Sequence, residues 1–316
     1  MNQINLSIVI PLLNEEESLK ELTSIIVNVC NEASLTFEIL LIDDGSTDSS
    51  WSVIKHLSTK DNRIKGVSFR RNYGKSAALN TGFSKSVGNV VITMDADLQD
   101  NPNEIPELYN LIVEEKYDII SGWKKNRKDP LSKTIPTKLY NSVTRMVSGI
   151  KLNDMNCGLK AYRSEVVKSI EVYGEMHRYI PVIAKWAGFN KIGEKVVIHS
   201  ERKYGKTKFG FERFIFGFLD LFSITFIGKF GKRPMHLFGS LGIIMFFVAF
   251  IFLFWIGIDK LFIDTSSKLI ADRTEFFIAI TAMIMGVQMF LAGFIGEMIS
   301  RNSPKRNFYQ IKEEIG

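Results

Sequence analysis

The chain has 316 residues and a formal net charge of +6, which is enough length for one large domain with an appendage. Its two cysteines and four histidines are dispersed, so neither a disulfide framework nor a zinc site is expected, and a reducing cytosolic setting fits. The basic excess lies beside long apolar segments, which indicates a membrane surface, and not nucleic acid, as the partner.

Short apolar runs alternate with amphipathic stretches up to residue 208, and the first run begins without the basic leader of a signal peptide. The apolar runs predict strands at Leu6–Ile10, Phe37–Ile42, Ile64–Phe69, Val90–Met94 and Asp118–Ser121. The stretches between them predict helices at Glu16–Cys30, Ser49–Leu57, Lys75–Lys85 and Asn103–Glu115. This alternation predicts an α/β fold with a mostly parallel sheet and flanking helices, whose ligands bind beyond the carboxyl ends of the strands.

The last third of the chain is membrane-like. Met235–Ile258 and Phe276–Ile295 carry no charged residue, and each is about 20 residues or more, enough to cross a hydrocarbon core of roughly 30 Å. We therefore predict two transmembrane helices within residues 233–300, at about 235–258 and 276–298. Two buried core helices are the alternative.

The flanks of these spans complete the organisation. Residues 209–232 are rich in aromatic side chains and predict amphipathic helices in the membrane interface, with a buried packing helix as the alternative. Residues 301–316 predict a loosely ordered cytoplasmic tail. Basic residues before the first span and after the second place both termini in the cytoplasm, although the connector between the spans is also partly basic.

Asp95 and Asp97 follow the apolar run Val90–Met94, with no basic residue beside them in the sequence. On an extended segment, side chains two apart point the same way, so the two carboxylates are expected to lie together. Like charges that close repel unless a proton or a metal joins them. Mg²⁺ or Mn²⁺ suits oxygen ligands and keeps positions open for substrate phosphates, so an enzyme that handles a diphosphate is indicated. A solvated turn rich in Asp is the alternative.

Two further segments follow strands. Pro11 is expected to end the first strand, and Asn14 to cap the next helix with Glu17 completing a capping box. The alternative is a loop against a nucleotide base or ribose. After the second strand, Asp44 can accept hydrogen bonds from a base or ribose, and Asp48 can cap the following helix.

The third strand is followed by Arg70–Ser76, which places cations and a glycine before a helix. Backbone N–H groups at such a position favour an anion. A solvated basic turn is the alternative.

Four segments together resemble the family 2 glycosyltransferases: Ile8–Glu15, Asp43–Asp48, Asn72–Lys75 and Asp95–Asp100 with Pro102, which stands one position late. The resemblance implies a GT-A fold for residues 1–208, a nucleotide-sugar donor, and Mg²⁺ or Mn²⁺ held at Asp95 and Asp97 with help from Gln99. It implies donor contacts from Pro11, Leu13, Asn14, Glu15, Asp43, Asp44, Asn72, Lys75, Asp95 and Ala96.

The second half is similar to the polyprenyl-phosphate glycosyltransferases, which include dolichol-phosphate mannose synthases and bacterial enzymes that glucosylate undecaprenyl phosphate. The segments that carry this resemblance are His177–Pro181, Lys185–Phe189, Arg202–Gly210 and Arg233–Gly239. Thr207 stands where the family usually has Ser, and Lys124 where many members have Arg, which loses a bidentate fork for phosphate.

This resemblance implies an inverting transfer of a hexose to a polyprenyl phosphate beside a bilayer. Asp97, Gln99 and Asp154 are the expected catalytic residues, although a capped turn is an equal reading of Asp154. The expected acceptor-phosphate contacts are Lys124, Lys133, Thr137, Arg202 and Lys206. A homo-oligomer is compatible with the sequence.

The donor is left open by the sequence. UDP-glucose or UDP-N-acetylglucosamine is favoured, with GDP-mannose as the alternative. A processive polysaccharide synthase is disfavoured because the chain contains no Gln-x-x-Arg-Trp motif. A non-catalytic membrane protein that binds nucleotide sugars is the alternative of another class.

Overall fold

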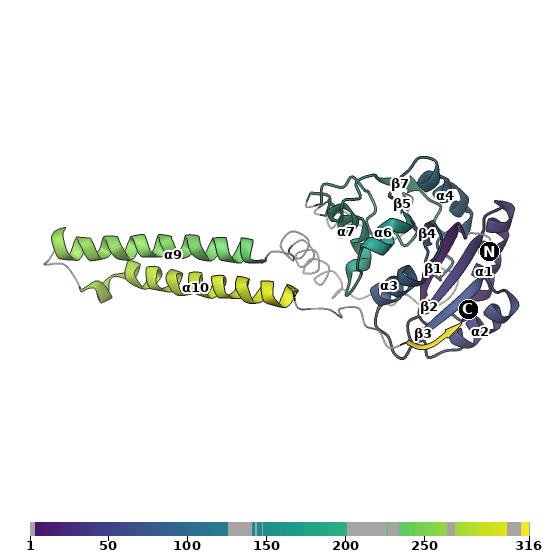
Figure 1. Ribbon diagram of the computed structural model, residues 1–316, viewed down its shortest axis with the longest axis horizontal. Helices are drawn as coiled ribbons and strands as arrows, with labels where there is room; N and C mark the ends of the chain where they lie inside the picture. The colour runs from purple at the N-terminus through teal and green to yellow at the C-terminus, as the bar shows by residue number, and fades with distance from the viewer. Residues whose placement is uncertain are drawn as a thin grey trace. The chain divides into compact units, whose positions relative to one another are not determined.

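The computed structural model describes residues 4–125, 141–142, 144–146, 148–200, 226, 234–263, 269–301 and 311–315. The chain divides into two compact units (Figure 1). The first comprises Met1–Ile224 with Asn307–Gly316, and the second comprises Thr225–Arg306.

The first unit is built on a sheet of eight strands in the order β7-β5-β6-β4-β1-β2-β3-β8. The strands are β1 Leu6–Leu12, β2 Phe37–Asp43, β3 Ile64–Phe69, β4 Val90–Thr93, β5 Ile119–Trp123, β6 Lys160–Arg163, β7 Ile192–Val196 and β8 Ile311–Ile315. β1 to β4 are parallel to one another, whereas β6 runs antiparallel to its neighbours β4 and β5. The predicted mostly parallel sheet is confirmed, and each predicted strand is present within a few residues of its expected bounds.

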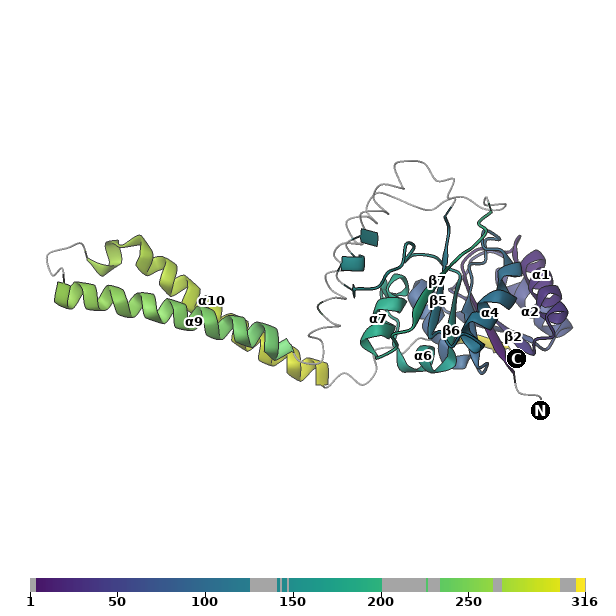
Figure 2. The ribbon, with the colours of Figure 1, turned by 90° about the horizontal axis from the view of Figure 1, so that it is seen from above.

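Helices connect the strands and cover both faces of the sheet, as Figure 2 shows from above. They are α1 Leu19–Glu32, α2 Ser50–Lys60, α3 Lys75–Lys85, η1 Pro102–Glu104, α4 Ile105–Val113, α6 Ser164–Ser169, η2 Met176–Arg178 and α7 Ile180–Trp186. Each predicted helix of this unit is found, although α1 begins later than expected.

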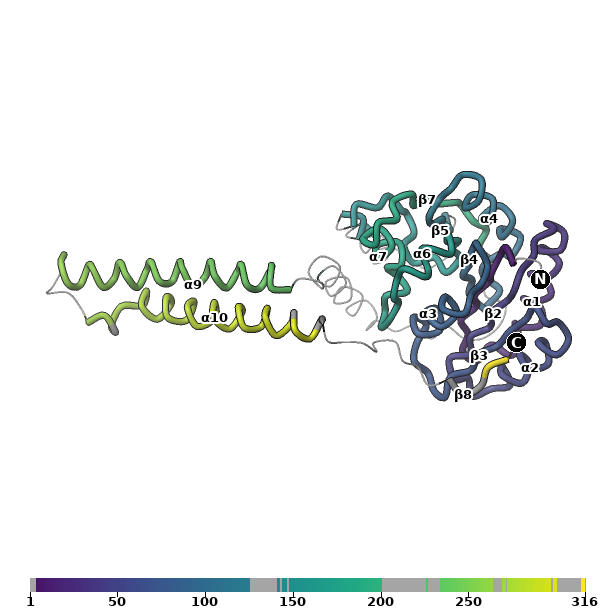
Figure 3. The backbone as a smooth tube through the Cα atoms, in the orientation of Figure 1, coloured from purple at the N-terminus to yellow at the C-terminus, as the bar shows by residue number. Residues whose placement is uncertain are grey.

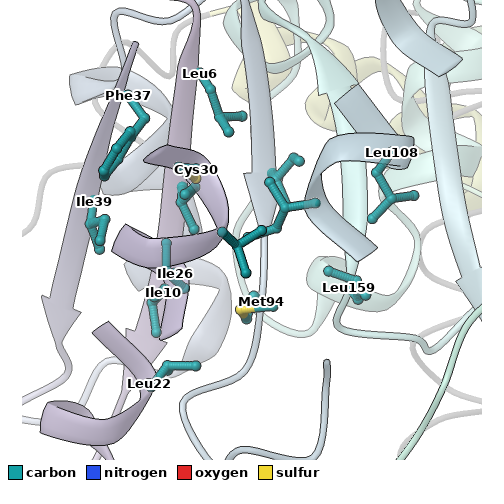
Figure 4. Packing of buried hydrophobic residues seen from close by; sticks show 14 of the residues in the cluster. Leu6, Ile10, Leu22, Ile26, Cys30, Phe37, Ile39, Met94, Leu108 and Leu159 are labelled. Carbon is teal, nitrogen blue, oxygen red and sulfur yellow. The ribbon is translucent and has the colours of Figure 1, made fainter. Parts of the chain in front are cut away.

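Two hydrophobic cores follow from the alternation of side chains along the strands. Leu6 and Ile10 of β1 point to the face covered by α1, where they pack with Ile26 (Figure 4). Val9, between them in the sequence, packs on the opposite face against α3 and α7. All four side chains are fully buried, and burial of one such side chain contributes roughly 1.5–3 kcal/mol. The strands are therefore apolar on both faces, as a covered parallel sheet requires.

The loop after β1 differs from its expected form. Pro11 lies within the strand and is paired in register with Ile42, so it does not end β1. Asn14 has a φ of +55° and accepts a hydrogen bond from the Thr47 backbone N–H at 2.8 Å, instead of capping α1. The capping box predicted with Glu17 is therefore wrong, and α1 begins at Leu19.

The loop after β2 passes very close to the loop after β3. Gly45 has a φ of +76°, and a Cβ placed on it would lie 2.5 Å from the carbonyl carbon of Arg71. Only glycine allows this approach, because the backbone conformation and the missing side chain are both required.

The chain returns to the sheet after its last long helix. β8 pairs antiparallel with β3 (Figure 3). Lys85 of α3 forms an ion pair with Glu314 of β8 at 2.5 Å. The expectation of a loosely ordered tail is wrong for Ile311–Ile315. β8 thus joins a sheet built from residues that precede the apolar helices.

The second unit contains two long helices, α9 Pro234–Ile258 and α10 Thr274–Arg301. A short π turn, η3 Asp259–Ile263, and a 3₁₀ turn, η4 Ile270–Asp272, lie between them. Both long helices are long and apolar enough to cross a membrane, and only 17% of each apolar window is buried. That exposure disfavours the alternative of buried core helices. The predicted interface helices at 209–232 lie outside the described residues, apart from Phe226.

The two helices approach each other closely at a pair of glycines. A Cβ on Gly242 would lie 2.5 Å from the Gly286 carbonyl oxygen, and one on Gly286 would lie 2.7 Å from that of Gly242. Small residues at a helix crossing permit backbone contact, which is a common way to pack helices in lipid.

Gly45→Ala should destabilise the protein by about 3 kcal/mol, since it combines a left-handed backbone cost of about 1–2 kcal/mol with a steric clash of similar size. Gly174 is the matched control, because its φ is +53° and nothing lies within 4 Å of its Cβ position. Gly174→Ala should therefore show the backbone cost alone. Thermal unfolding of the full-length protein in detergent measures both, and equal losses would contradict the contact with Arg71.

Candidate active site

The carboxyl ends of β1, β2, β4 and β5 lie at one edge of the sheet, because β6 restores the direction of β5 to that of β4. The register of β6 then decides which residues meet there. Lys160 is paired with Thr93 of β4 on one side and with Ser121 of β5 on the other. Asp95 and Gly158, each two residues beyond this row, consequently come into contact.

Asp95 is held between a lysine and a glycine. Its Oδ1 accepts a charge-assisted hydrogen bond from Lys75 Nζ at the start of α3. On the other side, a Cβ on Gly158 would lie 2.5 Å from Asp95 Oδ2, so only glycine leaves room for the carboxylate. The fold therefore places the Lys75 ammonium group beside Asp95, although no basic residue neighbours Asp95 in the sequence.

Positive charge surrounds the Asp95 carboxylate. Burial raises its pKa, but the charge and hydrogen bond of Lys75, followed by the charges of Lys124 and Lys160, outweigh burial and lower the pKa to about 2. The side chain is ionised at neutral pH and a third exposed, so it can bind a cation.

Asp97 lies in a turn, and the expectation that Asp95 and Asp97 share an extended segment is wrong. β4 ends at Thr93, and Leu98 has a φ of +60°. Asp97 is buried, and its Oδ1 accepts a hydrogen bond from the Gln99 backbone N–H at 3.2 Å. The turn brings the carboxylate back toward the chain that follows it.

Asp95 and Asp97 would provide two ligands of a metal whose other ligands come from the substrate and from water. Among the residues that the structure describes, no group of three His, Cys, Asp or Glu side chains could hold a metal. Asp95 and Asp97 supply two carboxylates, which suits Mg²⁺ or Mn²⁺ completed by phosphate oxygens and water, and does not suit a cage made by the protein alone.

Lys124 forms an ion pair with a buried carboxylate. Its Nζ lies 2.8 Å from Oδ1 of Asp100, whose side chain is 1% exposed. Burial lowers the pKa of Lys124, but the charge and hydrogen bond of Asp100 together with the charge of Asp95 oppose burial, and the pKa lies above its ordinary value. Lys124 therefore stays charged and is positioned by Asp100, whose role the sequence pattern did not indicate.

Gln99 connects this turn to the segment that follows β7. Its backbone oxygen accepts a hydrogen bond from Ser200 N at 2.9 Å, and its Nε2 donates to the Ser200 oxygen at 3.4 Å. Asp100 and His199 form the adjoining bridge. The turn that carries Asp97 is thus fastened to the chain just before Arg202.

Asp44 provides the anion for the backbone N–H groups before α3. Its carboxylate accepts hydrogen bonds from Tyr73 N at 2.7 Å and Gly74 N at 2.9 Å. Burial raises its pKa, these two bonds lower it, and the pKa settles at about 6. We predicted that these N–H groups favour an anion. They do contact one, but it is the Asp44 carboxylate of the same protein.

Hydrogen bonds join the loops that follow β1, β2 and β3. Asp43 accepts hydrogen bonds from Ser46 N and Ser68 Oγ, both at 2.9 Å. Asn14 contacts Thr47, as described above, and Asp44 connects this loop to Gly74. The predicted residues that share this carboxyl edge are Pro11, Leu13, Asn14, Glu15, Asp43, Asp44, Asn72, Lys75, Asp95, Ala96, Asp97, Gln99 and Lys124.

Asp154 lies in the loop before β6 and is 3% exposed. Its Oδ1 accepts a hydrogen bond from Asn156 N at 3.2 Å, and its own N–H donates to Glu194 of β7 at 2.9 Å. These are the contacts of a capped turn, so the structural reading of Asp154 has direct support and its catalytic role stays a prediction.

Lys160, like Asp100, has a place in the site that sequence reasoning missed. Its side chain is 3% exposed, and its Nζ donates to the Cys157 carbonyl. Burial lowers its pKa, and the charge of Asp154 opposes this shift. No motif marks it, since only the pairing register of β6 brings it beside Asp95. The predicted acceptor contacts Lys133, Thr137, Arg202 and Lys206 lie outside the described residues.

Known proteins with the same fold have been solved. Mannosyl-3-phosphoglycerate synthase from Rubrobacter xylanophilus superposes with a TM-score of 0.57 at 14% identity, over 72% of this chain and 75% of that one. Glucosyl-3-phosphoglycerate synthase from Mycobacterium tuberculosis, in complex with Mn²⁺ and UDP-glucose, gives a TM-score of 0.52 at 19% identity, over 71% and 78%. At these identities the likeness concerns the fold, and the expected GT-A type is confirmed.

Curated relatives align over nearly the whole chain. The dodecaprenyl-phosphate galacturonate synthase of Rhizobium johnstonii is 34% identical over 304 residues, which is 95% of this chain and 89% of the relative. The undecaprenyl-phosphate 4-deoxy-4-formamido-L-arabinose transferase of Aeromonas hydrophila is 32% identical over 296 residues, 93% of this chain and 88% of the relative. Residues 7–171 match glycosyl transferase family 2. The chain therefore belongs to glycosyl transferase family 2 and is a glycosyltransferase.

Proposed function

We propose that the protein transfers a sugar from a nucleotide sugar to a polyprenyl phosphate at a membrane surface. The observation that carries this proposal is the acidic pair Asp95 and Asp97 at the carboxyl edge of the sheet, in one chain with an apolar helical pair. Both named relatives act on a prenyl phosphate, and both align through the region of the two apolar helices. A lipid acceptor explains why a glycosyltransferase would carry such helices.

On the donor side, the residues at the edge bind and orient a nucleoside diphosphate. Asp95 and Asp97 would hold Mg²⁺ or Mn²⁺ together with the diphosphate oxygens, and Gln99 would orient a bound water or the sugar. Such an ion supplies Lewis-acid stabilisation of the departing nucleoside diphosphate. Lys75 adds a positive charge at the same place, and the fold neighbour with Mn²⁺ and UDP-glucose agrees with a metal-dependent reaction.

On the acceptor side, the chemistry asks for binding more than for a strong base. The second pKa of a phosphate monoester is about 6, so the acceptor is largely dianionic at neutral pH. Lys124, Lys133, Thr137, Arg202 and Lys206 are proposed to form the phosphate site. Holding the two substrates in line then supplies much of the acceleration, with inversion at the sugar carbon.

The membrane arrangement follows from connectivity and charge. α9 and α10 would span the bilayer, and the basic residues before α9 and after α10 favour a cytoplasmic position for the catalytic unit and both termini. The return of β8 to the sheet agrees with an even number of crossings.

The donor is proposed to be a UDP-sugar. UDP-glucose and UDP-N-acetylglucosamine are the first choices from the sequence, with GDP-mannose as the alternative. The relatives broaden this set, because their products carry galacturonate and 4-deoxy-4-formamido-L-arabinose.

Asp97→Asn should reduce the rate of nucleoside diphosphate release by about a thousandfold, or ~4 kcal/mol, because it removes one of two charged metal contacts. Asp61→Asn is the matched control, since Asp61 pairs with Arg63 at 2.7 Å at the opposite edge of the sheet. Release is measured with purified protein, Mn²⁺, donor and undecaprenyl phosphate. Unchanged release in the Asp97 variant would remove Asp97 from the reaction.

A donor panel with undecaprenyl and dolichyl phosphate should show radiolabelled sugar entering the organic phase from one UDP-sugar and not from GDP-mannose. The panel comprises UDP-glucose, UDP-N-acetylglucosamine, UDP-galacturonate and GDP-mannose. Transfer from GDP-mannose alone would overturn the UDP assignment. Transfer from none of the four would exclude these donors.

A further inference from the structure

The ion pair between Lys75 and Asp95 occupies the place where a metal would bind. Lys75 Nζ donates to Oδ1 of Asp95, and the two side chains are 34% and 33% exposed, so both are open to a ligand. A divalent cation and an ammonium group that contact the same carboxylate oxygen lie close together and repel each other strongly. Entry of the ion therefore requires Lys75 to leave.

Of the two partners, Asp95 is the fixed one. Gly158 packs against its carboxylate, and the Asp95 backbone N–H is directed at Asp100. The other two lysines cannot exchange in the same way. Lys124 is 10% exposed and paired with Asp100, and Lys160 is 3% exposed.

Lys75 can move at its side chain while its backbone stays in place. It is the first residue of α3, and the preceding Gly74 N–H is held by Asp44. The next residue, Ser76, is held by His177, because the backbone N–H of His177 donates a hydrogen bond to Ser76 Oγ at 3.0 Å. The ammonium group can therefore swing on a flexible four-carbon stem without disturbing the helix.

We propose that Lys75 is an exchangeable cation that holds Asp95 before a metal binds and passes to the donor diphosphate when the metal takes its place on Asp95. This inference rests on the proposed function. When Lys75 leaves the Asp95 carboxylate, the donor diphosphate becomes its new negatively charged partner. Metal and nucleotide therefore bind cooperatively. Lys75 is thus a positioning residue for Asp95 before the donor arrives and a diphosphate contact afterwards.

The test measures Mn²⁺ binding to the full-length protein in detergent by the electron paramagnetic resonance signal of free Mn²⁺, with and without UDP or GDP. In the wild type, a nucleotide should strengthen Mn²⁺ binding. Lys75→Gln removes the competing charge and should strengthen binding of Mn²⁺ alone by roughly fivefold, while reducing the gain from nucleotide. Lys75→Arg keeps the charge and should resemble the wild type.

Lys85→Gln is the matched control, because Lys85 lies on the same helix and pairs with Glu314 away from the site. It should leave both Mn²⁺ affinities unchanged. An affinity of Lys75→Gln for Mn²⁺ alone equal to that of the wild type would overturn the exchange, while the Asp97 result would still stand for the proposed function. Absence of Mn²⁺ binding to every protein, with either nucleotide present, would overturn the metal site itself and the exchange with it.

Discussion

The requirement that a carboxylate stay charged at the end of a buried strand governs this site. Asp95 follows β4, which is apolar on both faces, and without nearby cations burial would favour its neutral form. Three lysines from α3, the end of β5 and the start of β6 supply the compensating charge.

Buried pairing divides these lysines into fixed and movable groups. Asp100 holds Lys124 in place inside the protein, and such a pair is costly to break because one charge would be left alone. The pair of Lys75 and Asp95 is partly exposed, so water can replace either partner at much lower cost. Of the three lysines, Lys124 and Lys160 are therefore fixed by burial, and Lys75 is the one that can move.

The loops at the carboxyl edge are fastened to one another as well as to helices that they precede. Asp48 bonds the helix after its loop, because its Oδ1 accepts a hydrogen bond from Ser50 N at the start of α2 at 2.9 Å. Asn14 bonds the loop after β2, and Asp44 bonds the loop after β3. Local patterns predicted helix caps for such residues because short polar side chains favour caps and turns alike. Which backbone N–H each side chain reaches depends on strand order, which lies outside any local window.

The sequence alone determined the alternating strands and helices, the two apolar spans and the acidic pair after the fourth strand, because these depend on local periodicity and composition. It also indicated the family, since four motifs kept their order and spacing. Only the tertiary structure decided that Lys75 reaches Asp95, that Lys160 lies beside Asp95 and that Ile311–Ile315 add an edge strand to the sheet. Those facts depend on register and on pairing between distant segments, whose energies come from contacts that neither segment contains by itself.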